Sequence, residues 1–169
     1  MDGFRAIEPK DLNVNPFTMI GSEWMLITAG TSEKCNTMTA SWGSLGVLWS
    51  MPAATVYVRP TRYTLGFLDR EKYFSLSVFD EKYRGALDYC GSHSGRDGDK
   101  IGAAGLTPAF GAEAPYFREA KTVFLCRKLY RQPFQPACFT DDSLDGKNYP
   151  NKDYHIMFVG GIEKILVKA

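Results

Sequence analysis

The sequence predicts a mainly β fold, a β-barrel that carries a few short helices. Six stretches of strand length are rich in apolar, β-branched or aromatic residues, and they are spread over most of the chain. Segments with helical spacing are shorter and lie between them. Apolar residues make up 44% of the 169 residues and aromatic residues 14%, a globular composition that we expect to form a single domain over residues 1–169.

Three strands are expected in the first third of the chain. Residues 25–29 form a short apolar run that a turn-like Gly-Thr-Ser ends. Residues 35–42 alternate loosely and are rich in threonine, a residue enriched in strands. Residues 54–59, Ala-Thr-Val-Tyr-Val-Arg, are β-branched and follow Pro52, which is tolerated at the beginning of a strand.

Helical and strand signals alternate in the middle of the chain. Residues 61–70 have leucines three apart, and Thr61 is placed as the N-cap of the helix. Residues 73–79 place phenylalanine, leucine and valine on one face and serines on the other, a clean period of two. Residues 82–89 and 96–104 are two further helix candidates, and a glycine followed by a proline ends the second.

The last third of the chain contains the two longest predicted strands, residues 122–130 and 155–168. The adjacent glycines Gly160 and Gly161 predict a bulge or bend in the second of them. His155 begins this apolar strand, and we interpret it as a structural residue rather than a ligand.

Composition and charge argue against several classes of partner. The net charge is +1 with no long run of one sign, so no nucleic acid is expected. The apolar stretches are far shorter than the roughly 20 residues of a membrane helix, so we expect no membrane partner. The first residues lack a basic start followed by an apolar stretch, so we expect no signal peptide and a cytoplasmic protein.

The four cysteines do not predict a metal site. None stands in a Cys-x-x-Cys pair, and the two histidines add no zinc spacing. We expect the cysteines to be buried free thiols, with Cys126 in the core. A disulfide between two of them is the alternative that the sequence leaves undecided. The cysteines are Cys35, Cys90, Cys126 and Cys138.

The segment at residues 58–64, Val-Arg-Pro-Thr-Arg-Tyr-Thr, has the donors that a phosphate needs. It places the guanidinium groups of Arg59 and Arg62 and the hydroxyls of Thr61 and Thr64 at the junction of a strand and a helix. A helix N-terminus attracts anions, and arginine binds phosphate oxygens in a bidentate way. Taken alone, a solvated basic helix start has the same composition.

A second polar segment, residues 92–100, also has the composition of an anion site. It contains Ser94, Gly95, Arg96 and Lys100, and a helix that begins at Arg96 would place Lys100 one turn further on the same face. Taken alone, it also fits an exposed polar loop.

A third segment, residues 36–43, is suited to a flat ligand. The small and hydroxyl side chains from Asn36 to Ser41 let a ring approach the strand, where backbone groups match its polar edge. Trp42 supplies an aromatic wall. An ordinary edge strand is the alternative reading.

The order of these motifs resembles the flavin reductase-like, FMN-binding split-barrel family, and most closely its flavoredoxin-like branch. The resemblance rests on Asn-Thr-Met-Thr-Ala-Ser-Trp at residues 36–42, Trp-Ser-Met-Pro at 49–52, the arginine segment at 58–64, Ser-Gly-Arg-Asp-x-Asp-Lys at 94–100, and the tail at 153–162. It extends from about Phe17 to Lys168 and implies an FMN-binding split β-barrel with a few short helices.

The resemblance also implies a homodimer with FMN (flavin mononucleotide) near the subunit interface. Two positions depart from the usual pattern of the branch: Gly98 replaces an apolar residue and Gly161 replaces an acidic one. The implied cofactor-binding residues fall into three groups: isoalloxazine contacts from Thr39, Ala40, Ser41 and Trp42 beside Asn36; phosphate contacts from Arg59, Thr61, Arg62 and Thr64; and a second motif, from the same subunit or from the partner subunit, of Ser94, Gly95, Arg96 and Lys100.

Two functions follow from the resemblance. The first is an NAD(P)H-dependent flavin reductase, and the second is a flavoredoxin-like carrier that exchanges electrons with a partner protein. The flavin does the redox chemistry in both, so no general acid or base is assigned. Residues that we expect to border a nicotinamide slot are Trp42, Trp49 and His155.

Three other motifs are set aside. Asp-x-Ser-x-Asp-Gly at residues 141–146 begins like a calcium loop, but Lys152 stands where a bidentate glutamate is required, so we expect a plain loop. The centre of Gly-Ser-His-Ser-Gly at 91–95 is His93, so it is not a nucleophile elbow. No Gly-x-Gly-x-x-Gly follows a strand, which leaves a Rossmann domain unsupported.

Overall fold

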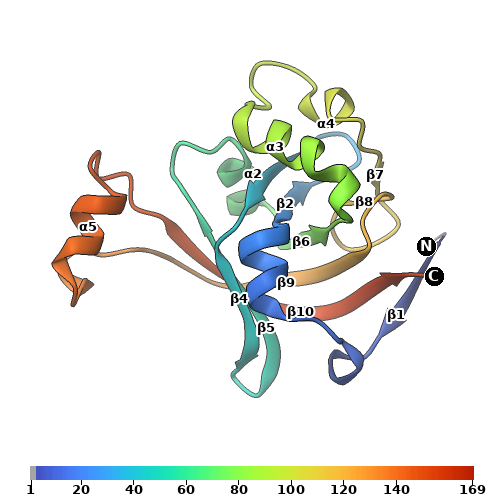
Figure 1. Cartoon of the computed structure of the whole chain (residues 1–169), viewed down its shortest axis with the longest axis horizontal. Helices are drawn as coiled ribbons and strands as arrows, with labels where there is room; N and C mark the ends of the chain where they lie inside the picture. Colours follow the sequence, from blue (N-terminus) through green and yellow to red (C-terminus); the bar gives the residue numbers. More distant parts are fainter. Residues whose placement is uncertain (1–2) are drawn as a thin grey trace.

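The computed structural model describes residues 3–169, so the first two residues of the expected domain lie outside the described part. Its centre is an antiparallel sheet of eight strands in the order β3-β2-β6-β9-β10-β5-β4, with β1 paired to β10 (Figure 1). A separate pair, β7-β8, lies beside it. The strands are β1 (Phe4–Ile7), β2 (Met25–Gly30), β3 (Cys35–Ala40), β4 (Gly43–Leu48), β5 (Met51–Val58), β6 (Tyr73–Val78), β7 (Pro108–Ala109), β8 (Tyr116–Phe117), β9 (Thr122–Pro133) and β10 (Ile156–Lys168).

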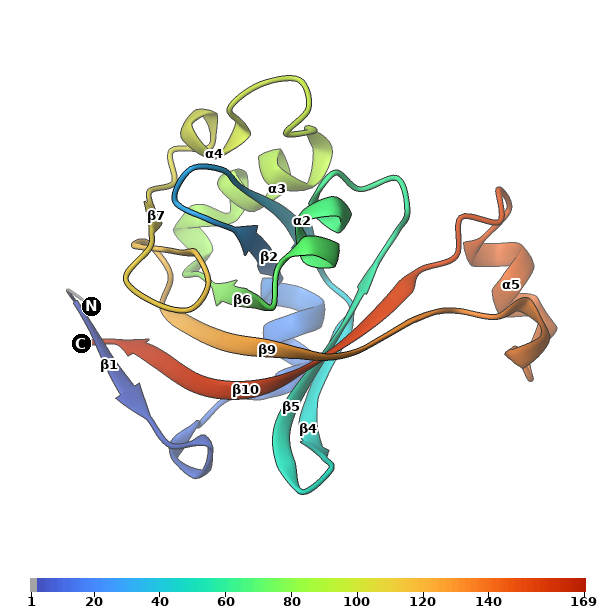
Figure 2. The same cartoon turned by 180° about the vertical axis from the view of Figure 1, so that it is seen from behind.

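The long strands β9 and β10 turn this sheet into a split barrel. The first half of β10 pairs with β5 and its last residues pair with β1, while β9 pairs with β10 along its length and with β6 over its first half. The register between β9 and β10 shifts at Val159/Gly160 and again at Ile162/Lys164, which confirms the bulge predicted at the glycine pair. Seen from behind, the two strands sweep around the barrel as one curved ribbon (Figure 2).

All six predicted strands are present, with changes at their ends. β3 ends at Ala40, two residues earlier than predicted, because Ser41 and Trp42 turn the chain into β4. β4 was not predicted, since its sequence Gly-Ser-Leu-Gly-Val-Leu contains two glycines that weaken the strand signal. β5 begins at Met51 and so includes Pro52 near its start.

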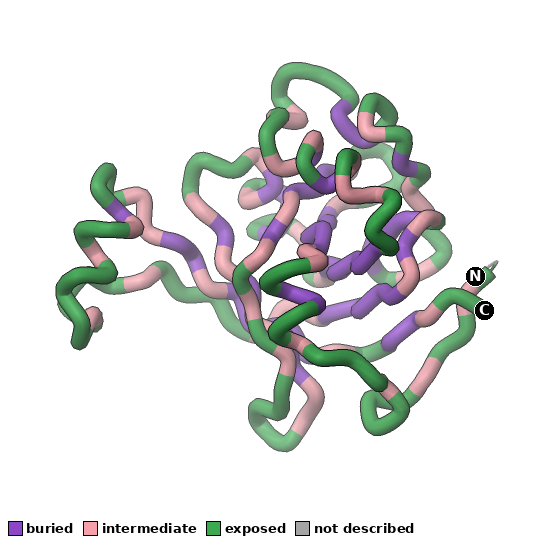
Figure 3. Tube along the Cα trace, in the orientation of Figure 1, coloured by how far each residue is buried: buried purple, intermediate pink, exposed green. Residues whose placement is uncertain are grey.

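Both faces of the sheet are covered. Phe74, Leu76 and Val78 of β6 point into the barrel interior, as their alternation predicts. The serines between them are also fully buried, because a second apolar cluster that includes residues of α3 and β8 covers the outer face. The burial map shows that buried residues concentrate on the central strands of the sheet (Figure 3).

The three predicted helices are present but begin later than expected. They lie together on one side of the barrel, above β2 and β6 (Figure 1). Thr61 is not an N-cap, since α2 begins at Thr64 after Tyr63. The helix expected from Arg96 begins only at Lys100, where the Asp99 carboxylate accepts from the backbone N–H of Gly102. The helices are α2 (Thr64–Arg70), α3 (Arg84–Ser92) and α4 (Lys100–Ala103).

A short helix near the N-terminus closes the barrel. Asn15 caps α1 (Pro16–Thr18), which continues into a π-helical turn at Met19–Glu23. The turn buries Met19 and Ile20 in the interior cluster. Single 3₁₀ turns occur at Pro9–Asp11, Glu81–Tyr83 and Pro136–Cys138.

Residues 134–155 form an arm that projects from the barrel at the end of β9 and β10 (Figure 1). It carries α5 (Asp142–Asn148), where we expected only a loop. The Asp141 side chain accepts from the backbone N–H of Ser143 and caps this helix. Most of the arm is exposed (Figure 3), but Tyr149, directly after α5, and His155, at the end of the arm, are buried.

The cysteine prediction is partly wrong. All four cysteines are free thiols, and Cys90 and Cys126 are buried as expected. Burial raises the pKa of the Cys126 thiol, so this side chain stays protonated in the core. Cys35 is half-buried, and Cys138 is exposed because the arm holds it away from the core.

Within residues 3–169, no helix has the length and apolar character needed to cross a membrane.

Candidate functional site

A cavity of about 230 Å³ lies where the end of β3, the end of β5 and the start of β10 meet. Six of the predicted site residues line it: Thr39, Ala40, Ser41, Trp42, Arg59 and Arg62. Three further residues complete the wall: Met38, Tyr57 and His155. The structure therefore brings together side chains that are far apart in the sequence.

The link between β3 and β4 forms one wall of this cavity. Gly43 follows the link, and a Cβ there would lie 2.9 Å from the Thr55 carbonyl oxygen and 3.0 Å from Met25, so the chain passes β5 closely at this point. Thr39 directs its hydroxyl away from the link and donates to the carbonyl of Leu87 in α3. What remains at the cavity is backbone, the small Ala40 and Ser41, and the half-exposed ring of Trp42.

Arg59 lies at the opposite wall and is already bound by the arm. Its Nη1 donates to Asp153 Oδ2 at 2.7 Å and its Nη2 donates to the Asn148 carbonyl at 2.9 Å. The guanidinium also lies 5.2 Å from the centre of the Tyr149 ring. The hydrogen bond from Arg59 holds the pKa of the Asp153 carboxyl below its ordinary value. Arg59 thus connects the cavity to the arm.

Arg62 is exposed and less constrained. Its Nη1 donates to the Gly91 carbonyl at 2.9 Å, near the C-terminus of α3. A cation is favourable there because the helix dipole is negative at that end. The remaining guanidinium N–H groups make no other hydrogen bond within residues 3–169, so they are free to bind an anion.

His155 lies opposite Arg59. Val58 pairs with Ile156, and in an antiparallel register the next two residues, Arg59 and His155, then stand opposite each other. Only 8% of the residue is exposed, and its ring packs against Trp42 at a centroid distance of 5.2 Å. Burial, together with the nearby charges of Arg59 and Arg62, lowers the pKa of His155 to about 4. The imidazole is therefore neutral at physiological pH.

The other predicted site residues lie outside this cavity. Asn36, Gly95 and Lys100 line a neighbouring cavity of about 460 Å³ between the β2–β3 turn and α4. Thr64 is buried, and its hydroxyl accepts from the Asn36 amide at 2.8 Å. A Cβ at position 95 would lie 2.1 Å from the Asn36 side-chain oxygen, so any larger residue there would displace the Asn36 amide from its hydrogen bond with Thr64.

The Lys100 amine makes hydrogen bonds within the fold and is not free to bind a ligand. The residue is buried, and its Nζ donates to the carbonyls of Cys90 and His93 at 2.8 and 3.0 Å. Burial lowers its pKa, and the two carbonyls at the end of α3 satisfy the amine. The arrangement holds the loop that follows α3.

That loop carries the remaining predicted residues. Arg96 lies over the Tyr63 ring and donates to the carbonyl of Thr61 at 3.2 Å. Ser94 accepts from the backbone N–H of Arg96. Ser94, Arg96 and Thr61 therefore hold the loop against the start of α2 and do not line the 230 Å³ cavity.

An apolar cavity of about 480 Å³ adjoins the first one. Ser41, Trp42 and Tyr57 line both, and Tyr149 from the arm lines the second. Phe17, which is 86% exposed, lies at this second cavity. Together the two cavities form a continuous surface with a polar end at the arginines and an aromatic end beside α1.

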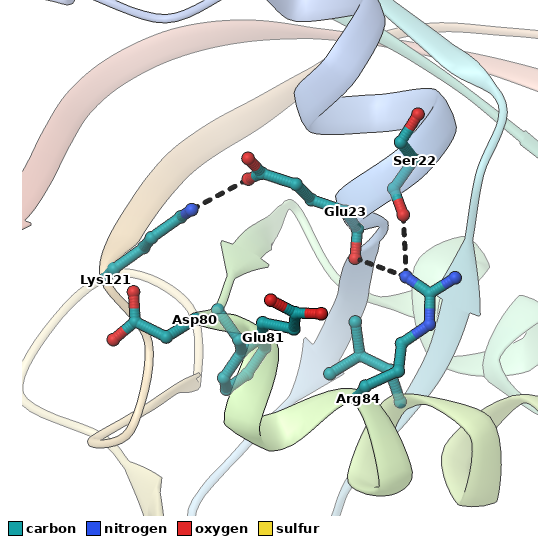
Figure 4. A pocket seen from close by; sticks show the side chains of 8 residues that line it. Ser22, Glu23, Asp80, Glu81, Arg84 and Lys121 are labelled. Atoms are coloured by element: carbon teal, nitrogen blue, oxygen red, sulfur yellow. Dashed lines mark hydrogen bonds and ion pairs between the residues drawn. The ribbon is translucent and has the colours of Figure 1, made fainter.

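A cavity of about 530 Å³ lies elsewhere, between the π-helical turn and α3. Its two cations are already engaged: Lys121 pairs with Glu23 at 2.8 Å, and Arg84 donates to the carbonyls of Ser22 and Glu23 (Figure 4). These contacts tie α3 and the start of β9 to the π-helical turn, and none of the predicted site residues lines this cavity.

Comparison with protein families identifies the fold. The profile of the flavin reductase-like domain matches residues 18–169. The chain belongs to this family. A comparison with curated protein sequences finds no significant match. Family membership supports a flavin-related function for this flavin reductase-like chain.

Solved structures share the split-barrel fold of this flavin reductase-like chain. The FMN-binding domain of a flavin reductase-like enzyme from Shewanella baltica OS155 has a TM-score of 0.70 at 16% identity, covering 98% of this chain and 77% of that one. Flavoredoxin from Methanosarcina acetivorans has a TM-score of 0.65 at 24% identity, covering 94% and 75%. Flavoredoxin from Desulfovibrio vulgaris (Miyazaki F) has a TM-score of 0.67 at 20% identity, covering 95% and 77%.

Some residues that line the 230 Å³ cavity or bind its arginines were not predicted. Tyr57 is two residues before Arg59 on β5, so the period of two places both on one face and would have indicated it. His155, which was expected to border a nicotinamide slot, lines the 230 Å³ cavity, whereas Trp49 lies in the exposed β4–β5 turn against Tyr130 and not at that cavity. No local signal marks Asp153 as the partner of Arg59, because the two are 94 residues apart.

Proposed function

We propose that this chain is an FMN-binding flavoprotein, a single split-barrel domain that acts as an NAD(P)H-dependent flavin reductase and works as a homodimer. The observation that carries the proposal is the convergence of two guanidinium groups and the β3–β4 link on one cavity. Phosphate is the natural partner of paired arginines, and a flat aromatic ring is the natural partner of exposed strand backbone beside Trp42.

The donor set fits FMN. Arg59 and Arg62 would bind the phosphate, and residues 39–42 would orient the ring, with the apolar cavity as space for its aromatic part. Asn36, Thr64 and Lys100 would support the site from behind, and the loop from Ser94 to Arg96 would close it. When bound, the flavin supplies the redox chemistry, and the side chains bind, orient and exclude water.

One observation favours the alternative, a flavoredoxin-like carrier that exchanges electrons with a partner protein. Trp42 lines the cavity and packs against His155, so an aromatic ring already occupies part of the space that a nicotinamide needs. Hydride transfer requires the reacting atoms to come within roughly 3–3.5 Å, whereas a carrier needs only an accessible flavin edge.

The test is an anaerobic stopped-flow titration of the FMN-loaded protein with NADH and with NADPH. A reductase bleaches the bound flavin, and we expect a Michaelis constant on the order of 0.1–1 mM because no dinucleotide fold holds the nucleotide. If dithionite reduces the flavin and neither nucleotide does, the carrier replaces the reductase.

The homodimer proposal rests on exposed apolar side chains. Phe17 and Val47 are 86% and 78% exposed, and Trp42 and Trp49 are about half exposed, all on α1 or the region around β4. A second copy that covers this region would bury apolar surface beside the cavity.

A further inference from the structure

Tyr149 and His155 form a hydrogen-bonded pair behind the cavity. The Tyr149 hydroxyl lies 2.8 Å from His155 Nδ1, and both residues are buried, with 3% and 8% of their surface exposed. Tyr149 belongs to the arm, directly after α5, and His155 lines the 230 Å³ cavity. The pair therefore connects the arm to the wall of the site.

The direction of this hydrogen bond follows from the partners that each atom has. Within residues 3–169, the only other group bonded to the Tyr149 hydroxyl is the backbone N–H of His155, which is a donor, so His155 Nδ1 is the acceptor of the hydroxyl proton. A buried hydroxyl proton needs an acceptor, and burial raises the pKa of Tyr149, which keeps that proton in place. Nδ1 then carries no proton, and a neutral ring must carry its proton on Nε2.

The surroundings of the ring keep it neutral. Arg59 faces it from β5 and Arg62 lies beyond, and both disfavour a charged imidazole. The Asp153 carboxylate would favour the charged form, but it is paired with Arg59 at 2.7 Å. Nε2 makes no hydrogen bond to any described residue, so this donor is available to whatever occupies the cavity.

We propose that Tyr149 is a positioning residue that fixes the tautomer of His155, and that His155 Nε2–H donates a hydrogen bond to the flavin in the cavity. The proposal rests on the proposed function for the identity of the ligand. Carbonyl oxygens and ring nitrogens of a flavin accept such a bond. A donor at this place strengthens its bond as negative charge accumulates on the ring, which raises the reduction potential.

The tautomer is testable without any ligand. The chain has two histidines, so ¹⁵N NMR of histidine-labelled protein, assigned with His93→Gln, resolves the ring of His155. We expect a protonated Nε2 and an unprotonated Nδ1 from about pH 5 to 8. Tyr149→Phe should raise the pKa of His155 and mix the two tautomers. Tyr154→Phe, which removes a hydroxyl bonded to Asp145 in the same arm, should leave both unchanged.

Adding FMN tests the proposed hydrogen bond from His155 Nε2 to the flavin. The Nε2–H resonance should shift on binding, and His155→Ala should weaken FMN about 3- to 10-fold, the effect of one uncharged hydrogen bond. His155→Gln retains an N–H donor at similar reach and should restore most of the affinity. The reduction potential of bound FMN should fall in Tyr149→Phe and stay unchanged in Tyr154→Phe.

The two possible failures are distinguishable. A proton on Nδ1 in the free protein, or a Tyr149→Phe variant with an unchanged tautomer and potential, overturns the positioning role while FMN binding stands. A wild-type protein that does not quench FMN fluorescence overturns the proposed function, and with it the hydrogen bond to flavin.

Discussion

Arg62 lies between β5 and α2, and its guanidinium makes a single hydrogen bond to the described residues, at the Gly91 carbonyl. If it binds the phosphate, Arg62→Ala should weaken FMN roughly 10- to 100-fold, the effect of a lost charge-assisted hydrogen bond. Riboflavin, which lacks the phosphate, should bind nearly as before. Fluorescence titration with both ligands measures this.

Arg70→Ala is the matched control, because Arg70 ends α2, packs over Phe67 and lines neither cavity. It should change neither affinity. An equal loss of FMN and riboflavin in Arg62→Ala would instead assign Arg62 a structural role at the end of α3.

His155 also makes stability depend on pH. Its pKa is about 4 in the folded chain and 6.5 when unfolded, so between these values the unfolded chain binds more protons. Stability should therefore fall as pH falls from about 6.5 to about 4, by on the order of 3 kcal/mol. Urea unfolding across this range measures the slope.

Two variants separate His155 from other groups. His155→Gln should abolish most of the slope, whereas His93→Gln, at an exposed position, should keep it. Asp153 has a folded pKa below 3.8 and titrates beneath this window. A slope that survives in His155→Gln would show that this histidine is not the group responsible.

At the site, the sequence predicted residues whose chemistry depends on neighbours adjacent in the chain. It did not predict the contacts that these residues make with segments far away in the sequence. The arginines of residues 58–64 and the small residues before Trp42 are adjacent in the chain, so their chemistry is visible there. The engagement of Arg59 by Asp153, and of Lys100 by the carbonyls at the end of α3, depends on how separate elements pack. Arg59 and Lys100, which were predicted as free cations, therefore use hydrogen-bond donors for contacts within the fold.

At the scale of elements, the bulge of β10 rests on one glycine. A Cβ at Gly160 would lie 2.6 Å from Phe74 and 2.8 Å from Cys126, both in the barrel core. Gly160→Ala should destabilise the chain by about 1–3 kcal/mol, the effect of overpacking. Gly46→Ala in β4, where no atom lies within 4 Å, is the control and should change stability little. Equal urea midpoints for the two variants would contradict the close packing.

Periodicity predicted the elements that bury one clear face and missed those that depend on tertiary pairing. β6 alternates strongly, and it was found with nearly correct ends. β4 contains two glycines and has mostly exposed residues, so only its pairing with β5 makes it a strand. The start of α4 depends on the Asp99 cap, which overrides the apparent start at Arg96.

At the scale of the whole molecule, the exposed apolar region around α1 and β4 and the projecting arm both favour a second copy. Light scattering should give twice the chain mass of 18.9 kDa. Val47→Lys, on the exposed β4, should shift the protein toward monomer, whereas Lys82→Glu, at an exposed position in the 3₁₀ turn before α3, should not. A wild-type monomer that still binds FMN would exclude a site shared between subunits.

The three tryptophans lie in three different surroundings, so their fluorescence emission should respond differently to a ligand in the cavities. Trp42 forms part of both cavities, Trp24 lies under the Arg84 guanidinium, and Trp49 lies in the β4–β5 turn against Tyr130. A chromophore that enters the cavities meets Trp42 at contact distance, whereas Trp24 and Trp49 line neither cavity. The emission of Trp42 is therefore the one tied most directly to occupancy.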